Sequence, residues 1–449
     1  MKALKSSRSV SVISFFLFIA LFVSGCSKKK GDTPPTPPTV NPPEIKEAVY
    51  DETGCLYTSY KNLVMAGYQG WFAAQGDASN RGWYHYQREN KFEPGFTNID
   101  FWPDVTEYTK KYKTAFKYAD NTDAYVYSPY DEESVDLHFK WMKDYGIDGV
   151  FMQRFVGEIK PSNVKGKNHF NKVLENALKA ANKYGRAICI MYDLSGCSSA
   201  DVAYLETDWN ELQTLFSLFD NKKNPTYVRH KGKPLLAIWG VGFNDNRAYT
   251  IADVDQLVTK LKGPDKKVSI MLGVPYYWRT LSNDTENSGL LHPLIKKCDI
   301  VMPWAVGRYN SSNYNNVGPA RLMEDVQWCA TNNVDYVPLI FPGFTWGNMH
   351  NDPTKYNEIP REKGDFLWKQ TAGAKQSGAK SLYVAMFDEV DEGTAIFKTN
   401  KEDNLPLNGT GKFVGIETGL ASDYYLWLTG QAARWFHGEN GFGTQKPVR

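Results

Sequence analysis

Four carboxylic acids lie within one short segment near the end of this chain. Asp388, Glu389, Asp391 and Glu392 directly follow the apolar run Leu382–Met386. That run is typical of a strand buried on both faces of a parallel sheet. Acids after such a strand are costly to bury unless they lie in a polar cleft. In parallel α/β proteins that cleft lies at the carboxyl ends of the strands. A solvated acidic loop is the alternative interpretation.

Glu389 and Glu392 have the residue type and spacing of a pair that hydrolyses glycosidic bonds. Such hydrolysis usually needs one carboxyl to protonate the leaving oxygen and another to act as base or nucleophile. On a straight strand these side chains would be about 10 Å apart on opposite faces. A turn, which Gly393 favours, would bring them to about 7 Å or less. Acids this close repel, so one should titrate high and donate the proton. Spacing alone assigns neither role.

The elements that must position these acids recur along the chain. From residue 60 onward, short apolar runs alternate with segments of helical periodicity. We expect eight strands, at Leu63–Gln69, Ile147–Gln153, Ala187–Tyr192, Leu235–Trp239, Val268–Leu272, Ile300–Trp304, Tyr336–Ile340 and Leu382–Met386. This repeated alternation predicts an α/β fold, a (β/α)8 TIM barrel. A doubly wound open sheet is the alternative. Gly185 should end one helix as a left-handed cap, and Thr250 with Asp253 should begin another as a capping box.

The segment 70–146, between the first two expected strands, is long and rich in aromatic residues. It contains Trp71, Phe72, Trp83, Tyr84, His85, Tyr86, Phe101 and Trp102. A loop that follows a barrel strand lies on the catalytic face. We therefore expect this insertion to form one wall of a cleft, with a short extra strand at Ala124–Tyr127. A packed cap without a role in ligand binding is the alternative.

Aromatic and polar residues follow the ends of the expected strands. The candidates for substrate binding are Tyr68, Gln69, Trp71, Arg154, Asp193, Trp239, Tyr277, Trp304, Trp346 and Asp388. Beside paired acids, this mixture fits a carbohydrate better than a phosphate or an acyl substrate, because flat rings stack on sugar C–H faces. The sequence contains no glycine-rich phosphate loop and no G-x-S-x-G motif. For the aromatic residues, packing in the core or at the rim is the alternative. For Arg154, it is a structural pair with an acid such as Asp193.

The N-terminus has the pattern of a targeting segment. Lys2, Lys5 and Arg8 precede the apolar run Val10–Val23, which is short for a membrane span and leads to Ser-Gly-Cys26. This order resembles the bacterial lipoprotein signal, with cleavage before a Cys that is then lipidated. We expect a signal peptide at 1–26 with Cys26 as the lipidation site, a proline-rich linker at 27–47 and a catalytic domain at 48–449. The protein would be exported and held to the cell envelope by acyl chains, at the periplasmic or outer-membrane surface. An uncleaved anchor is the alternative.

Composition narrows the possible partners. The net charge of +2 is too small for a nucleic-acid binder that relies on phosphate contacts. Neither a CxxC pair nor an HExxH motif occurs, so we expect no metal and no cofactor. With Cys26 lipidated, an odd number of cysteines remains, which rules out complete internal pairing. Cys189, inside an apolar strand, should be a buried free thiol. We expect a monomer.

Several motifs give the chain a family resemblance over about residues 60–440. Gly67-Tyr-Gln-Gly-Trp-Phe72, His138-Phe-Lys-Trp-Met-Lys-Asp-Tyr-Gly-Ile-Asp-Gly-Val150 and Ser422-Asp-Tyr-Tyr-Leu426 resemble the glycoside hydrolase family 71/99-like group of exported bacterial proteins. Family 99 enzymes are endo-acting α-mannosidases on a (β/α)8 barrel, with a Glu-Trp-His-Glu-Gly motif after the last strand. Glu389-Val-Asp-Glu-Gly393 occupies that place here.

The resemblance implies a role for each glutamate. Glu389 would assist the 2-hydroxyl of the sugar through a 1,2-anhydro intermediate, with retention, and Glu392 would be the general acid and base. Val390 and Asp391 replace the Trp and His that line the family's sugar subsite, so mannose need not be the sugar here. A relationship to family 71 would instead imply an α-1,3-glucan and inversion.

These observations predict an exported, lipid-anchored glycoside hydrolase that acts on a polysaccharide or oligosaccharide. The first alternative is a tethered glycan-binding protein that uses the barrel without catalysis. The second is a structural lipoprotein without a sugar ligand.

Overall fold

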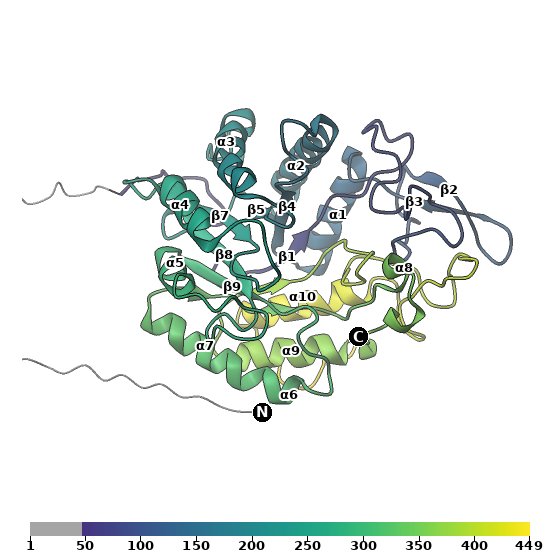
Figure 1. The fold of residues 1–449 in the computed structure, drawn as a ribbon. Coiled ribbons are helices and arrows are strands. Elements are labelled where there is room, and N and C mark those ends of the chain that lie inside the picture. Colours follow the sequence, from purple (N-terminus) through teal and green to yellow (C-terminus); the bar gives the residue numbers. More distant parts are fainter. Residues whose placement is uncertain (1–46) are drawn as a thin grey trace, which may run out of the picture. The chain divides into compact units, whose positions relative to one another are not determined.

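A sheet of parallel strands forms the centre of the computed structural model, which describes residues 47–449 (Figure 1). All of these residues belong to one compact unit. The predicted signal peptide, Cys26 and nearly all of the predicted linker lie outside the described residues. No helix within 47–449 has both the length and the apolar character that crossing a membrane requires.

The sheet follows the predicted strands closely. Its parallel members are β1 (Val64–Tyr68), β4 (Gly149–Phe155), β5 (Ala187–Asp193), β7 (Lys233–Trp239), β8 (Ser269–Pro275), β9 (Ile300–Trp304), β10 (Asp335–Tyr336), β11 (Leu339–Ile340) and β12 (Leu382–Val384). They pair in the order β10-β9-β8-β7-β5-β4-β1-β12-β11. A short antiparallel strand, β6 (Arg229–His230), pairs with β7.

The two ends of this order are consecutive pieces of chain, and they close the sheet. Only Val337 and Pro338 separate β10 from β11. Val337 N donates to Val301 O at 3.0 Å, and Tyr383 N donates to Pro338 O at 3.1 Å. Proline has no N–H to donate, which interrupts the seventh predicted strand at this point. The predicted fold class is confirmed, as a TIM-barrel-like α/β fold.

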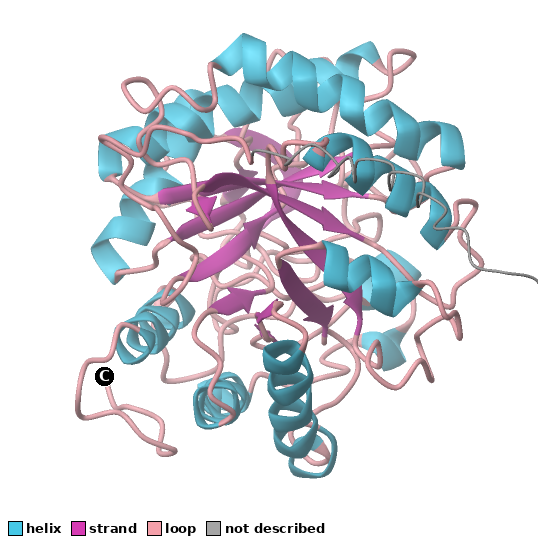
Figure 2. Ribbon diagram, turned by 90° about the vertical axis from the view of Figure 1, so that its left-hand side faces the viewer, coloured by secondary structure: helices cyan, strands magenta, loops and turns pink. Residues whose placement is uncertain are grey.

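Helices surround the outer face of the sheet (Figure 2). The helices within residues 47–449 are α1 (Glu132–Tyr145), α2 (Val164–Tyr184), α3 (Ser199–Phe216), α4 (Ile251–Lys262), α5 (Leu291–Lys297), α6 (Tyr314–Val317), α7 (Pro319–Thr331), α8 (Gly347–His350), α9 (Asp365–Gln376) and α10 (Tyr424–Phe436), with 3-10 turns η1 (Pro353–Lys355) and η2 (Glu362–Gly364). The short α8 packs instead on the insertion, where Asn348 donates to Ile99 O at 2.9 Å. Gly185 ends α2 in the left-handed conformation, with φ of 59°. Thr250 and Asp253 form the predicted capping box of α4.

Successive strand residues face two different cores. Along β4, Val150 and Met152 pack outward beneath the helices, whereas Phe151 points into the barrel. Because side chains alternate along a strand, the same parity places Gln153 inside and Arg154 outside. This alternation decides which strand-end residues reach the interior.

The long insertion after β1 contains the expected extra strand. β3 (Asp123–Val126) pairs antiparallel with β2 (Tyr112–Lys117). Part of the insertion is a packed aromatic cap. In this cap the Trp102 ring lies 5.9 Å from that of Phe92 and 5.1 Å from that of Phe413. Of the prediction for this segment, the structure confirms an aromatic-rich cluster next to the first strand.

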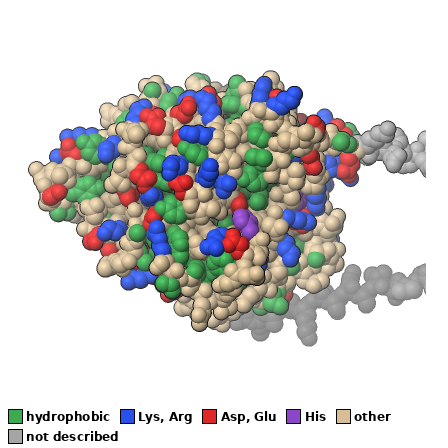
Figure 3. Space-filling view, turned by 180° about the vertical axis from the view of Figure 1, so that it is seen from behind, with side chains coloured by type: hydrophobic (Ala, Val, Ile, Leu, Met, Phe, Trp, Pro, Cys, Tyr) green, Lys and Arg blue, Asp and Glu red, His purple; other side chains and the backbone are tan. Residues whose placement is uncertain are grey.

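The surface carries mixed charge. On the face drawn in Figure 3, Lys and Arg side chains are interspersed with Asp and Glu. No continuous basic surface appears on that face, in keeping with the small net charge of the chain.

Candidate active site

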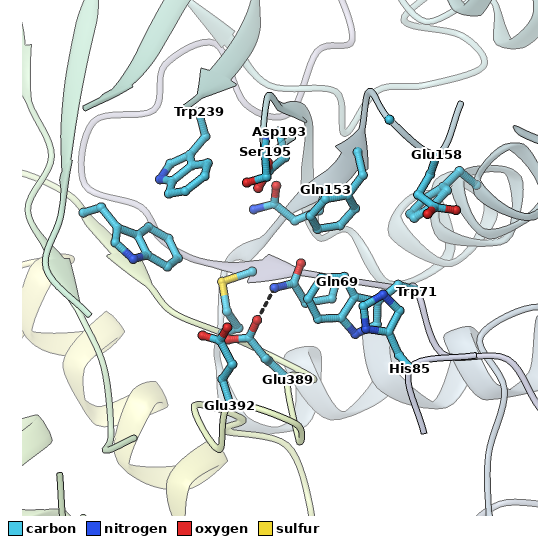
Figure 4. A pocket seen from close by; sticks show the side chains of 15 residues that line it. Gln69, Trp71, His85, Gln153, Glu158, Asp193, Ser195, Trp239, Glu389 and Glu392 are labelled. Atoms are coloured by element: carbon cyan, nitrogen blue, oxygen red, sulfur yellow. Dashed lines mark hydrogen bonds between the residues drawn. The ribbon is translucent and has the colours of Figure 1, made fainter. Parts of the chain in front are cut away.

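A pocket of about 390 Å³ opens at the carboxyl ends of the barrel strands. Residues from strand ends, the insertion and the acidic segment line it together (Figure 4). Seven of the residues predicted from the sequence line the pocket, namely Gln69, Trp71, Asp193, Trp239, Trp304, Glu389 and Glu392. The chain therefore brings together side chains more than 300 residues apart, such as Gln69 and Glu389.

Glu389 and Glu392 converge in this pocket. Figure 4 shows their carboxyl groups side by side. Glu389 is only 3% exposed and accepts hydrogen bonds from Gln69 Nε2 and the Thr394 hydroxyl. The Glu392 carboxyl is more open and has no hydrogen-bond donor among the described residues. One acid is thus fixed in place, while the other is free to meet a ligand.

The surroundings of the acid pair favour protonated carboxyls. Burial, and to a lesser extent the nearby Asp391 and Asp193, together raise the pKa of Glu392 to about 7. Burial also raises the pKa of Glu389 well above its ordinary value, with Glu392 and Asp391 adding to the effect. Close carboxyls titrate as a unit, so the pair keeps a proton near neutral pH.

Asp388 holds the acidic segment against β1. Its carboxylate accepts from the backbone N–H groups of Gln69 at 2.7 Å and Gly70 at 2.9 Å. The side chain is completely buried, and burial raises its pKa to about 7. Asp388 was predicted to bind substrate, but it does not line the pocket, and its contacts fix the position of Gln69.

Tyr68 and Arg154 point out of the barrel, away from the pocket. The Tyr68 hydroxyl lies 2.8 Å from His138 Nδ1. The Arg154 guanidinium donates to both oxygens of Asp208 on α3, at 2.5 and 2.6 Å. For Arg154 the structure has the ion pair given above as the alternative, but its acid is Asp208 and not Asp193.

Tyr277 and Trp346 are also absent from the pocket lining. The Arg321 guanidinium lies 4.3 Å from the centre of the Tyr277 ring. Trp346 Nε1 donates to Glu358 at 2.6 Å. Both rings occupy loops beyond the pocket.

Other lining residues were not among the predicted site residues. They are His85, Gln153, Phe155, Gly157, Glu158, Phe170, Ser195 and Met386. Gln153 precedes Arg154 on β4 and faces the pocket because successive side chains alternate along a strand. Glu158 sits at the rim, where it pairs with Arg81 at 2.5 Å and accepts from the Tyr84 hydroxyl. These partners come from the insertion, whose path the sequence does not reveal.

Several polar atoms of lining residues have no hydrogen-bond partner within the described protein. They include two acceptors, Gln69 Oε1 and Gln153 Oε1, and two donors, Trp71 Nε1 and Trp239 Nε1. Buried polar atoms are nearly always paired, so these four favour a ligand that both donates and accepts hydrogen bonds. Hydroxyl groups do both.

Charge restricts the ligand further. Glu158, Asp193, Glu389 and Glu392 line the pocket, and no Lys or Arg of residues 47–449 does. Within the same residues, no cluster of three His, Cys, Asp or Glu side chains is arranged to hold a metal ion. Their five cysteines are free, and Cys189 is fully buried.

Comparison with known proteins supports the fold. No protein-family model and no curated protein sequence matches the chain. Among solved structures, it is similar to the GH99 endo-alpha-mannosidase of Bacteroides thetaiotaomicron in complex with BIS-TRIS-propane. The TM-score is 0.59 at 16% identity, over 84% of this chain and 98% of that one. A second structure of that mannosidase gives 0.59 at 15% identity, with the same coverage. GH5_18 from Bifidobacterium longum matches at a TM-score of 0.40 and 10% identity, over 69% of this chain and 75% of that one. The chain has a glycoside hydrolase-like TIM barrel fold.

Proposed function

We propose that this protein is a glycoside hydrolase that cleaves an oligosaccharide or polysaccharide with Glu389 and Glu392. The observation that carries the proposal is the convergence of these two carboxyls in a pocket at the carboxyl ends of the strands. Most glycoside hydrolases place such a pair beside the scissile bond.

The surroundings of each acid suggest its role. Glu392 faces the pocket without a protein donor, and its pKa of about 7 suits a general acid at neutral pH. Glu389 accepts two hydrogen bonds, which favour its anion. Although burial and the neighbouring acids raise the pKa of Glu389 well above its ordinary value, its two donors favour the anion, so we place the retained proton on Glu392 when the reaction begins.

The reaction that follows is the one implied by the family resemblance. Glu392 gives its proton to the glycosidic oxygen as the C–O bond breaks. Glu389 takes the proton of the sugar's 2-hydroxyl as that oxygen attacks the anomeric carbon. Water then opens the anhydro-sugar, gives a proton to Glu392 and leaves a hydroxyl at the anomeric carbon, and the 2-oxygen recovers a proton from Glu389. An endo-α-mannosidase-like substrate is the first to test, because of the resemblance to family 99.

The pocket lining suggests a neutral glycan. Its unpartnered donors and acceptors match sugar hydroxyls. Four acids line the pocket and no Lys or Arg of residues 47–449 does, which disfavours uronate or sulfate groups. Trp239 and Trp304 lie with ring centres 5.1 Å apart and both offer apolar surface to the pocket. Trp239 lies on the side of the pocket opposite Trp71 (Figure 4).

A reducing-end assay tests the proposal. We expect the purified protein to release new reducing ends from one of a panel of α-mannans, α-glucans, plant glycans and host glycans. Glu389→Gln and Glu392→Gln should each lower kcat by at least about 1000-fold, because general acid–base catalysis contributes on that order. Glu286→Gln, at an exposed acid outside the pocket, is the matched control.

Two results would contradict the proposal. Full activity in Glu392→Gln would show that Glu392 is not the general acid. Binding of a glycan without release from any member of the panel would instead identify a glycan-binding protein on a barrel scaffold.

We also propose that the protein is exported and anchored to the cell envelope by lipid on Cys26. The support is the order of a basic segment, an apolar segment and Ser-Gly-Cys at the N-terminus. A tether of this kind would hold the barrel near polymers outside the cell.

A further inference from the structure

One contact connects the acidic segment with the aromatic wall of the pocket. His85 Nδ1 lies 3.2 Å from Asp391 Oδ2. The His85 ring stacks on Trp71 with ring centres 3.8 Å apart and planes 7° from parallel. Trp71 in turn stacks on Phe155 at 4.9 Å. Figure 4 shows His85 and Trp71 lying face to face beside the acids.

Both members of the His85–Asp391 contact occupy unfavourable positions. His85 has a φ of 62°, a left-handed conformation that residues with a side chain seldom adopt. The Asp391 side chain is 1% exposed, and its Oδ1 has no partner within the described protein. A third buried carboxyl next to Glu389 and Glu392 adds repulsion. The fold keeps the left-handed backbone of His85 and the buried carboxyl of Asp391 despite their cost, and both lie beside the pocket.

We propose that Asp391 and His85 are positioning residues for the reaction proposed above. Asp391 holds the imidazole against Trp71 and so fixes the aromatic wall. The Asp391 carboxyl also sets the charge beside Glu389 and Glu392. This inference rests on the proposed function. Asp391 stands where the family 99 motif has its His.

Charged and titratable groups from the acidic segment and from the rim of the pocket surround the His85–Asp391 pair. From the acidic segment, Asp391 is close to Glu389 and Glu392, whose pKa values it raises, and to Asp388, whose pKa it also raises. From the insertion, it faces His85 and Tyr86. Arg81 and Glu158 act on His85 from the rim of the pocket.

The pH dependence of kcat/KM tests the charge effect. Glu392 must be protonated to act, and a negative Asp391 keeps it protonated to higher pH. We expect Asp391→Asn to move the basic limb of the profile down by about one pH unit, because it removes this repulsion without changing shape. An unchanged profile would overturn this part of the proposal.

Two substitutions at His85 separate the ring from the hydrogen bond. His85→Asn can keep the bond to Asp391 and tolerates the left-handed backbone, but it removes the ring that covers Trp71. We expect its KM to rise about 3- to 10-fold, the usual contribution of one aromatic pair, with the basic limb unmoved. His85→Phe keeps a ring on Trp71 and removes the side-chain partner of Asp391. It should keep KM and move the basic limb in the direction of Asp391→Asn. Equal KM values for the two variants would overturn the positioning role.

A measurement without turnover distinguishes the failure of this inference from that of the proposed function. In protein labelled with 15N-histidine, His85 is assigned by its absence from the spectrum of His85→Phe. Burial lowers the pKa of His85 to about 3, so its own titration does not interfere at neutral pH. We expect its nitrogen shifts to change near pH 7, where Asp391 titrates, and to stop doing so in Asp391→Asn. If the protein cleaves no glycan but shows this change, the proposed function is wrong and the His85–Asp391 contact is supported. If the His85 nitrogen shifts of the wild type do not change near pH 7, the His85–Asp391 contact is refuted.

Discussion

At the scale of single residues, the acidic segment concentrates like charge at a cost in stability. Burial raises the pKa values of Asp388, Asp391 and Glu392 to about 7. Each of these acids ionises less readily in the folded chain than in the unfolded one, so the native state loses stability where they are charged. Such a cost is common where a site needs groups that titrate near neutral pH.

Glu392 allows this cost to be measured. Its folded pKa of about 7 exceeds its unfolded value of 4.5, so the folded state binds more protons between these pH values. Its contribution to stability therefore falls as pH rises through that window and stays lost above pH 7. Relative to wild type, Glu392→Gln should add about 2 kcal/mol to the free energy of unfolding at pH 8 and far less at pH 5.

Urea unfolding at the two pH values gives the comparison. Glu286→Gln, an exposed acid, serves as control and should shift neither value. A Glu392→Gln protein that is no more stable than wild type at pH 8 would mean that Glu392 is not desolvated as described.

At the scale of elements, the sequence predicted the strands and the end of the sheet where the candidate pocket lies, but not the direction in which each side chain points. A strand buried on both faces has no alternation of apolar and polar residues to read. The prediction therefore took both Tyr68 and Gln69 as binding residues, and Arg154 in place of Gln153. In each pair one neighbour points inward and the other outward. The insertion that contains His85 was expected to form a cleft wall, but the contacts of its individual residues depend on a long irregular path that the sequence does not reveal.

Arg154 and Asp208 should act on stability and leave the pocket intact. The pair is buried, and the Tyr192 hydroxyl also donates to Asp208 at 2.7 Å. Arg154→Met leaves Asp208 as an unpaired buried charge, so we expect a loss of about 3–5 kcal/mol in the free energy of unfolding. Adding Asp208→Asn removes the charge, keeps an acceptor for Tyr192 and should restore part of that loss.

Denaturant unfolding and glycan KM, measured on the same proteins, decide the matter. The double variant should bind glycan with the KM of the wild type. A raised KM in the folded double variant would mean that Arg154 does contribute to substrate binding.

At the scale of the whole molecule, the repeated alternation of strands and helices was enough to predict the barrel. The match to the Bacteroides mannosidase over 84% of the chain at 16% identity agrees with it. Activity does not follow from the fold, because barrels of this kind support many reactions. Val390 and Asp391 are where this chain differs from the family 99 motif that it resembles, and Asp391 contacts His85, which lines the pocket.

The proposed anchor is a property of the whole chain, and labelling can detect it. In a host that processes bacterial lipoproteins, the full-length protein should incorporate labelled fatty acid, and Cys26→Ser should not. Cys55→Ser, at a cysteine of the folded unit, is the matched control. Labelling that persists in Cys26→Ser would refute lipidation at this residue.

The pairing of the first strand with the last also fixes when the pocket can exist. Val64 of β1 pairs with Leu382 of β12, and Gln69 meets Glu389 across 320 residues of sequence. A ribosome makes the chain from its N-terminus, so both glutamates are added after every other lining residue. A nascent chain that ends before residue 389 contains the aromatic wall but neither acid. The proposed hydrolase activity therefore cannot arise until nearly all of the chain has been synthesised.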